Sequence, residues 1–154
     1  MMNLCSDVLA ALEGKTLVTA ESLTGGGIGS CLTAVPGSSR IYKGGVISYT
    51  NQVKQSVLGV DGGVLEKLGA VSEETAAAMV SGVRRLLCAD VAVSVTGLAG
   101  PDADEFGNPV GTVFIGYEDA RKSFVRKFLF SGDRDDVRNQ TIRTALTILL
   151  EQQK

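Results

Sequence analysis

The chain has 154 residues, the length of a single domain, and such a domain buries about two-thirds of its unfolded surface without needing metal or disulfide staples. A net charge of −2 without any long Lys/Arg run excludes the electrostatic pattern of nucleic-acid-binding proteins, and no apolar run approaches the roughly 20 residues of a membrane span. The absence of histidine excludes a Ser-His-Asp triad, a Cys-His pair and every histidine metal site, so proton transfer must use Lys, Asp, Glu, Tyr or Cys.

The first half of the chain predicts a helix, a strand, a glycine-rich turn and a second helix, followed by another strand and a short helix. The pattern predicts a helix over residues 4–12, a buried strand over 16–20, a helix over 28–34, a strand over 45–49 and a helix over 52–58. Asn51 is a good N-cap for the last of these helices. Lys54 is therefore expected in its first turn.

The second half predicts strands that neighbour one another in the sequence. We expect a helix over 73–87 capped by Ser72, a buried strand over 91–95, a hairpin of strands over 110–117 and 123–130, and a last helix over 133–152. Strands that alternate with helices early and pair as neighbours late indicate the α/β class, with a mixed sheet covered by helices on both faces. Ligands gather at strand ends in such sheets, so the loops at 24–29 and 96–101 are expected to face one crevice.

These properties predict one domain over residues 1–154, without nucleic-acid or membrane partners. The N-terminal residues lack a basic leader segment, which favours a cytoplasmic location. Cys5, Cys31 and Cys88 are an odd number without ligand spacing, so they are expected to be small buried hydrophobes. The acids at 102, 104 and 105 are more typical of a solvated turn than of a cation site, and we expect no metal.

Ser22 is the first candidate for chemistry, because it lies between a buried strand and a glycine-rich turn. This position can expose a hydroxyl beside unpaired N–H groups that stabilise an oxyanion. A simpler interpretation is that Ser22 or Thr24 caps the following helix. A phosphate cradle is a third interpretation, but the fingerprint glycine is missing at position 30, where Ser30 stands.

Lys54 and Arg138 are the candidate basic residues. The positive end of a helix dipole disfavours an ammonium, which favours a neutral Lys54 able to act as the base for a serine. Arg138 lies on the apolar stripe of the last helix with Ile142, Ala145 and Leu149, and therefore needs an anionic partner. That partner is either an internal carboxylate or a substrate phosphate, and the sequence does not choose between them. Arg134 is more typical of a solvated first-turn residue.

Six ordered motifs carry a resemblance over nearly the whole chain. They are Ala20-Glu21-Ser22-Leu23-Thr24-Gly25-Gly26, Tyr49-Thr50-Asn51-Gln52-Val53-Lys54, Gly69-Ala70-Val71-Ser72, Thr96-Gly97-Leu98-Ala99-Gly100-Pro101, Pro109-Val110-Gly111-Thr112-Val113 and Gly132-Asp133-Arg134. In this order they resemble the CinA C-terminal domain, the PncC nicotinamide-nucleotide amidase family. The resemblance departs at Leu23, where the family commonly carries Cys, and this difference is expected to alter packing.

The resemblance implies a single three-layer α/β/α domain and a cytoplasmic enzyme that forms a homodimer or higher homo-oligomer. It also implies conversion of nicotinamide mononucleotide to nicotinate mononucleotide and ammonia, in pyridine nucleotide salvage, without a cofactor. The expected catalytic residues are Ser22, Lys54 and Tyr49, and the expected substrate-binding residues are Thr24, Gly25, Gly26, Thr96, Gly97, Gly100 and Arg138. The alternative is a non-catalytic nucleotide-binding module or regulatory subunit that uses the same crevice.

Overall fold

A five-stranded mixed sheet forms the centre of the molecule in the computed structural model, which describes residues 1–154. Its strands, in the spatial order β2-β1-β3-β4-β5, are β2 (Tyr42–Ile47), β1 (Leu17–Glu21), β3 (Val91–Gly97), β4 (Thr112–Glu118) and β5 (Ser123–Leu129). β1 runs parallel to β2 and β3, whereas β4 is antiparallel to both β3 and β5. The parallel half comes from the alternating part of the sequence, and the antiparallel half comes from the predicted hairpin.

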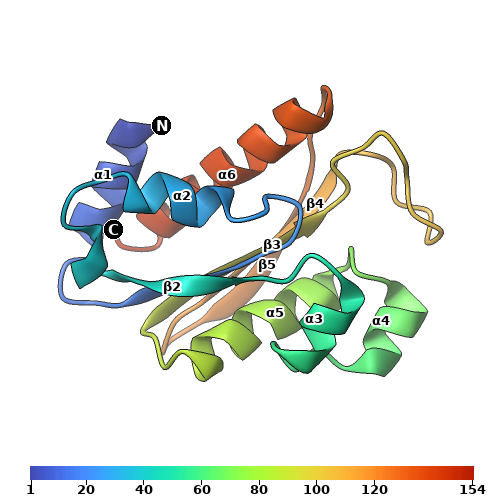
Figure 1. Ribbon diagram of the computed structural model, residues 1–154, viewed down its shortest axis with the longest axis horizontal. Coiled ribbons are helices and arrows are strands. Elements are labelled where there is room, and N and C mark those ends of the chain that lie inside the picture. The colour runs from blue at the N-terminus through green and yellow to red at the C-terminus, as the bar shows by residue number, and fades with distance from the viewer.

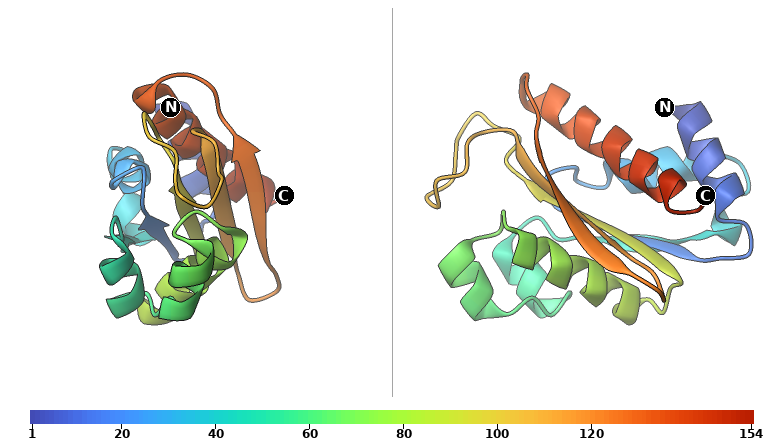
Figure 2. Two further views of the ribbon diagram at one scale, coloured as in Figure 1. Left: turned by 90° about the vertical axis from the view of Figure 1, so that its right-hand side faces the viewer. Right: turned by 180° about the vertical axis from the view of Figure 1, so that it is seen from behind.

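Helices cover both faces of this sheet, so the predicted three-layer α/β/α architecture is confirmed (Figure 1). One layer contains α1 (Met2–Ala11), α2 (Gly27–Thr33) and α6 (Arg134–Glu151), and the other contains α3 (Asn51–Ser56), α4 (Gly62–Leu68) and α5 (Glu73–Leu86). A short 3-10 turn, η1 (Ser38–Arg40), leads into β2. Figure 2 shows the same layers from the end of the sheet and from behind.

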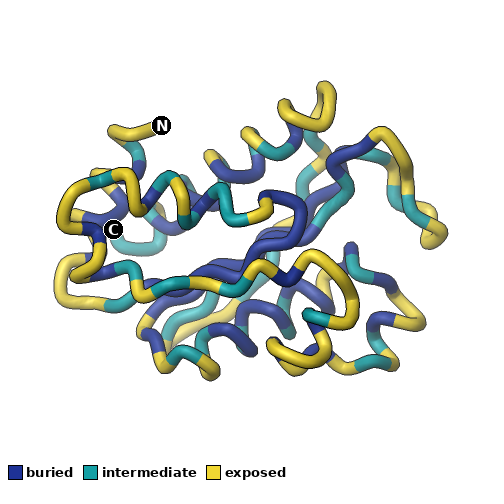
Figure 3. The backbone as a smooth tube through the Cα atoms, viewed as in Figure 1, coloured by how far each residue is buried: buried dark blue, intermediate teal, exposed yellow.

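Two hydrophobic cores follow from the alternation of side chains along β1. Leu17 belongs to the core beneath α1, α2 and α6, whereas Val18 and Ala20 belong to the core beneath α5. β3 lies between the two layers, and six of its seven residues are buried. This strand runs through the dark centre of Figure 3, as the apolar run over 91–95 predicts.

Several boundaries differ from those predicted. β2 begins at Tyr42 rather than at residue 45, because its glycines pair with β1 instead of ending the strand. Thr50, not Asn51, caps α3, and its side chain accepts the N–H of Val53. β3 extends through Gly97, so only the residues after it form the loop. α4 was not predicted, because its first two residues are glycines.

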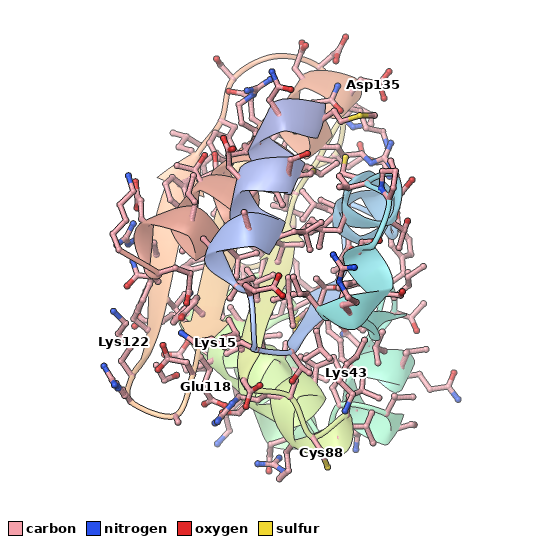
Figure 4. The ribbon with its side chains drawn as sticks, turned by 90° about the vertical axis from the view of Figure 1, so that its left-hand side faces the viewer. Lys15, Lys43, Cys88, Glu118, Lys122 and Asp135 are labelled. Atoms are coloured by element: carbon pink, nitrogen blue, oxygen red, sulfur yellow. The ribbon has the colours of Figure 1, made fainter.

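The carboxyl ends of the two parallel strands β1 and β3 lie at one end of the sheet. Glu21 is opposite Val95 in the register, and both chain termini lie at the other end (Figure 1). Figure 4 looks at that far end, where the Lys43 ammonium donates to the carbonyls of Leu87 and Cys88 just after α5. The glycine-rich turn after β1 and the loop after β3 are thereby brought together away from the termini.

Candidate active site

Ser22 follows β1 directly, and hydrogen bonds fix its main chain on both sides. Its N–H donates to the carbonyl of Val95 in β3 at 3.0 Å, and the preceding carbonyl of Glu21 accepts the N–H of Ser48 at 2.8 Å. The side chain is only 7% exposed. A hydroxyl held this firmly at the end of a strand has the placement that a nucleophile requires.

Glu21 organises the turn on the α2 side of Ser22. Its carboxylate accepts the Thr24 hydroxyl at 2.5 Å and the N–H groups of Ile28 and Gly29, at the start of α2, at 2.9 and 3.0 Å. The side chain is 2% exposed. Gly26 precedes α2 with φ +98°, a conformation that a residue with a Cβ rarely adopts. The buried carboxylate therefore replaces a local cap and locks the turn that follows the serine.

Lys54 lies on the α3 side of Ser22. Its Nζ is 3.0 Å from Ser22 Oγ, 2.6 Å from the Ser48 carbonyl and 3.3 Å from the Tyr49 carbonyl. The side chain is 1% exposed, and burial lowers the pKa of its ammonium to about 8. The prediction that the helix dipole lowers this pKa was wrong in its cause, because desolvation accounts for the shift.

The partners of Lys54 suit a neutral amine. A neutral amine has two N–H donors and one lone pair, and the two carbonyls can take both N–H groups. The lone pair is then free to accept the proton of the Ser22 hydroxyl. In such an arrangement a lysine can serve as the base for a serine hydroxyl in a chain that lacks histidine.

Ser22 opens into a cleft of about 360 Å³ between the two loops. The cleft is lined by Ser22, Leu23, Tyr49, Ala70, Val71, residues 96–102 and Arg134. Of the residues predicted to bind substrate, Thr96, Gly97 and Gly100 therefore lie on its wall. The Thr96 hydroxyl is engaged with the Ala70 carbonyl at 2.7 Å, so it shapes the wall and holds the two segments together.

Arg134 is the cation of this cleft. One of its guanidinium nitrogens donates to the Gly100 carbonyl at 2.7 Å, and another donates to the Tyr49 hydroxyl at 3.1 Å. Both side chains are exposed, so they reach the cleft from solvent. The guanidinium thus joins the start of α6 to both walls of the cleft, in a position to meet an anionic group.

Arg138 lies outside the lining of the cleft, which departs from its expected role. Its Nε donates to the Leu23 carbonyl at 3.0 Å, its Nη2 donates to the Thr24 carbonyl at 3.3 Å, and its Nη1 is 3.8 Å from Asp135. Asp135, one turn earlier on the same helix, supplies the nearest carboxylate, and its side chain is exposed. The main function of the guanidinium in this structure is to hold the carbonyls of the turn.

The glycine-rich turn contributes less to the cleft than expected. Thr24 is buried with its hydroxyl on Glu21, and neither Gly25 nor Gly26 lines the cleft. Leu23, the departure from the family pattern, is 4% exposed and packs into the core beneath α2 and α6, so its side chain affects packing. Only Ser22 and Leu23 extend from this turn to the cleft wall.

The sequence did not assign site roles to six further lining residues, Ala70, Val71, Leu98, Ala99, Pro101 and Asp102. The segment 69–72 and the 132–134 segment with Arg134 were both among the resembling motifs, which was the available signal. No group of three or more His, Cys, Asp or Glu side chains is placed to hold a metal ion. None of the helices combines the length and apolar character needed to cross a membrane.

Comparisons with known proteins find a family model and relatives that match nearly the whole chain. The family model for the CinA C-terminal domain matches residues 2–153. The chain is 44% identical over 151 residues to a CinA-like protein of Endomicrobium trichonymphae, an alignment that covers 94% of this chain and 35% of that protein. The chain thus spans about a third of the length of the curated relatives it matches.

Two solved structures share nearly the whole fold. The competence damage-inducible protein A of Klebsiella pneumoniae subsp. pneumoniae MGH 78578 superposes with a TM-score of 0.95 at 36% identity, covering 97% of this chain and 94% of that one. The competence/damage inducible protein CihA of Agrobacterium tumefaciens gives 0.95 at 34% identity, with 99% and 95% covered. The chain therefore belongs to the CinA C-terminal domain family.

Proposed function

We propose that the protein is an amidohydrolase that converts nicotinamide mononucleotide to nicotinate mononucleotide and ammonia, in pyridine nucleotide salvage. The observation that carries this proposal is the buried Lys54 amine, 3.0 Å from Ser22 Oγ and with a pKa of about 8. A neutral lysine beside a serine activates the hydroxyl for attack on an acyl carbon. The resemblance of the sequence motifs to the nicotinamide-nucleotide amidases supplies the choice of substrate.

The chemistry proceeds in two steps. Ser22 Oγ attacks the carboxamide carbon while Lys54 accepts its proton, and the protonated lysine then delivers a proton to the departing ammonia. Water hydrolyses the resulting acyl-enzyme, with Lys54 again as base. The Leu23 N–H makes no hydrogen bond within the chain, and as the amide directly after the nucleophile it is the donor that we assign to the oxyanion.

The residues that line the cleft support this choice of substrate at both of its ends. Leu23, Val71 and Leu98 supply apolar walls for the pyridine ring beside Ser22. Arg134 supplies the positive charge for the phosphate, exchanging its bond to the Tyr49 hydroxyl for a pair of bonds to phosphate oxygens. The Tyr49 hydroxyl then becomes free to contact the same phosphate.

Ammonia release from nicotinamide mononucleotide tests the proposal, with the phosphate-free riboside as a second substrate. We expect wild-type turnover with the mononucleotide and a loss of about a thousand-fold in Ser22→Ala, whose circular dichroism spectrum should be unchanged. A mass increase on Ser22 after rapid quenching would identify the acyl-enzyme. Tight binding of the nucleotide without any ammonia release would instead favour the non-catalytic binding module.

A further inference from the structure

A second groove, larger than the cleft of Ser22, adjoins that cleft. Its volume is about 680 Å³, and it lies between α3, α4 and the segment 104–106. Ala70, Val71 and Leu98 line both hollows, so the two meet along this shared wall. Ammonia, the leaving group of an unsubstituted amide, needs no space of this size. The proposed reaction therefore leaves the groove without a role.

Hydrogen bonds hold the outer wall of this groove in place. The Asp104 carboxylate accepts the N–H groups of Phe106 and Asn108 at 3.1 and 3.0 Å, and the Asn108 side-chain amide donates to the Val71 carbonyl at 3.1 Å. The ring of Phe106 lies against Gly69, where a Cβ would come within 2.6 Å of two ring carbons. The ring therefore packs closely against the backbone of Gly69, and Phe106 remains 39% exposed.

The polar side chains of the groove select the chemistry of its occupant. The other polar groups that line it are the side-chain amides of Asn51, Gln52 and Gln55 and the carboxylates of Glu66 and Glu105, and no lysine or arginine is among the lining residues. The amide side chains both donate and accept hydrogen bonds, whereas the carboxylates only accept them and attract positive charge. The groove therefore favours a donor-rich or cationic group and disfavours an anion.

The groove and Arg134 lie on opposite sides of Ser22, so the groove lies on the amine side of the scissile bond. Arg134 begins α6 on one face of the sheet, whereas α3 and α4 lie on the opposite face (Figure 1). Ser22 lies at the strand end between them. An acyl group whose phosphate is bound by Arg134 extends toward α6, and the amide nitrogen on the other side of the carbonyl carbon then points toward the groove.

We propose that this groove is a leaving-group subsite, so that the enzyme also hydrolyses N-substituted amides whose amine carries a hydroxyl or a second ammonium group. This proposal rests on the amidase function proposed above. Ser22 Oγ bonds to the carbonyl carbon, the C–N bond breaks, and the nitrogen takes the proton held by Lys54. The free amine leaves through the groove, and water converts the acyl-enzyme to the carboxylate.

The test uses the 2-aminoethyl, 2-hydroxyethyl and 2-carboxyethyl amides of nicotinate mononucleotide, which have similar sizes, beside the unsubstituted amide. We expect the wild-type enzyme to favour the aminoethyl over the carboxyethyl amide by about ten-fold or more in kcat/KM, since an exposed charge pair contributes up to about five-fold and the carboxylates of Glu66, Asp104 and Glu105 line the groove. The hydroxyethyl amide should lie between them. Release of each amine is measured directly.

Two double variants compare the loss of acids inside the groove with the loss of acids elsewhere on the surface. Glu66→Gln/Glu105→Gln should reduce the aminoethyl preference to about two-fold or less, because it removes two of the three carboxylates of the groove and leaves only Asp104, whose carboxylate already accepts three hydrogen bonds. Asp7→Asn/Glu13→Gln removes two exposed acids away from the groove and should keep the wild-type preference. Equal rates for the charged amides, or release of ammonia without cleavage of any substituted amide, would overturn the subsite and leave the amidase function standing. Failure with all four substrates would overturn both.

Discussion

The two sides of Ser22 differ in whether hydrogen-bond partners compensate a buried charged group. On the α2 side, the Glu21 carboxylate receives three hydrogen bonds from the turn and from α2. On the α3 side, Lys54 contacts two neutral carbonyls and the Ser22 hydroxyl, with no carboxylate among its hydrogen-bond partners. Both side chains are almost inaccessible to solvent. Hydrogen-bond donors thus surround the Glu21 carboxylate, whereas no counter-charge accompanies the Lys54 ammonium.

This difference separates a structural role from a chemical one. A buried carboxylate that accepts several N–H and O–H donors is stabilised in its charged form and ties its donors together. A buried ammonium without a counter-charge is destabilised, which brings its pKa to about 8 and makes the neutral base available near neutral pH. We infer that Glu21 holds the turn that Lys54 and Ser22 use.

Replacing Lys54 should give the largest effect and should separate activity from stability. Lys54→Met removes the base, so kcat for ammonia release should fall by about a thousand-fold or more. The same change removes a desolvated amine, so the free energy of unfolding at pH 7 should rise by about 1 to 3 kcal/mol, measured by urea titration. Lys54→Arg should be equally inactive because its guanidinium stays charged, and wild-type turnover in that variant would contradict the role as base.

Replacing Glu21 should have the opposite effect on stability. Glu21→Ala leaves the N–H groups of Ile28 and Gly29 and the Thr24 hydroxyl without their acceptor. We expect the free energy of unfolding to fall by about 4 kcal/mol, because hydrogen bonds to a charged group are worth more than neutral ones. Glu13→Ala, at an exposed position outside α1, serves as control and should change stability by about 0.5 kcal/mol or less. An unchanged stability in Glu21→Ala would show that α2 has another cap.

The pH dependence follows from the depressed pKa of Lys54. Activity should rise with pH through about 8 and level off above it, because the neutral amine is the active form. Between about 8 and 10.5 the unfolded chain binds a proton at this residue that the folded chain does not, so stability rises with pH across this window. The whole contribution is about 3 kcal/mol. Urea titrations from pH 8 to 10.5 should show the free energy of unfolding rising with pH in the wild type but not through this residue in Lys54→Met. The same pH dependence in both proteins would contradict a lowered pKa of Lys54 in the folded chain.

Local signals made some of these features predictable. The Ser72 cap, the acids of the first turn and the apolar stripe identify α5, and the apolar run over 91–95 identifies β3. Residue type also limits the catalytic base, because the chain has no histidine. The sequence predicts both Ser22 and Lys54 as site residues, and the structure places their Oγ and Nζ atoms 3.0 Å apart. In these cases a short segment contains all the information that determines its structure.

Features that depend on distant segments were missed. The burial of the Lys54 amine depends on Ser22 and Ser48, which lie after β1 and β2, and no local pattern in a six-residue helix reveals it. The contacts of Arg134 depend on the placement of Gly100 and Tyr49, which are 34 and 85 residues away in the sequence. Arg138 was correctly placed on the inner side of α6, but the nearby carbonyls that it reaches belong to residues 23 and 24. Sequence periodicity gives the direction of a side chain and leaves its partner open.

The smallest expected effect concerns Arg134 and Arg138, two arginines of α6. The first is proposed to contact substrate, and the second holds the turn after β1. Arg138 is half-buried against the carbonyls of Leu23 and Thr24, whereas Arg134 is exposed in the cleft. Arg134→Gln should therefore raise KM for nicotinamide mononucleotide by about ten-fold, as loss of a charge-assisted contact does, and change little for the riboside.

Arg138→Gln should instead lower the free energy of unfolding by about 1 to 2 kcal/mol, because two turn carbonyls lose a charged donor. Any loss of turnover in this variant should be similar for the mononucleotide and the riboside, since it reflects a loosened nucleophile turn and not a lost phosphate contact. The two variants are compared by steady-state kinetics on both substrates and by urea titration. If Arg138→Gln selectively weakened the mononucleotide while Arg134→Gln did not, the phosphate would lie beside the glycine-rich turn, and the acyl group would extend from Ser22 toward Gly25 instead of toward Gly100.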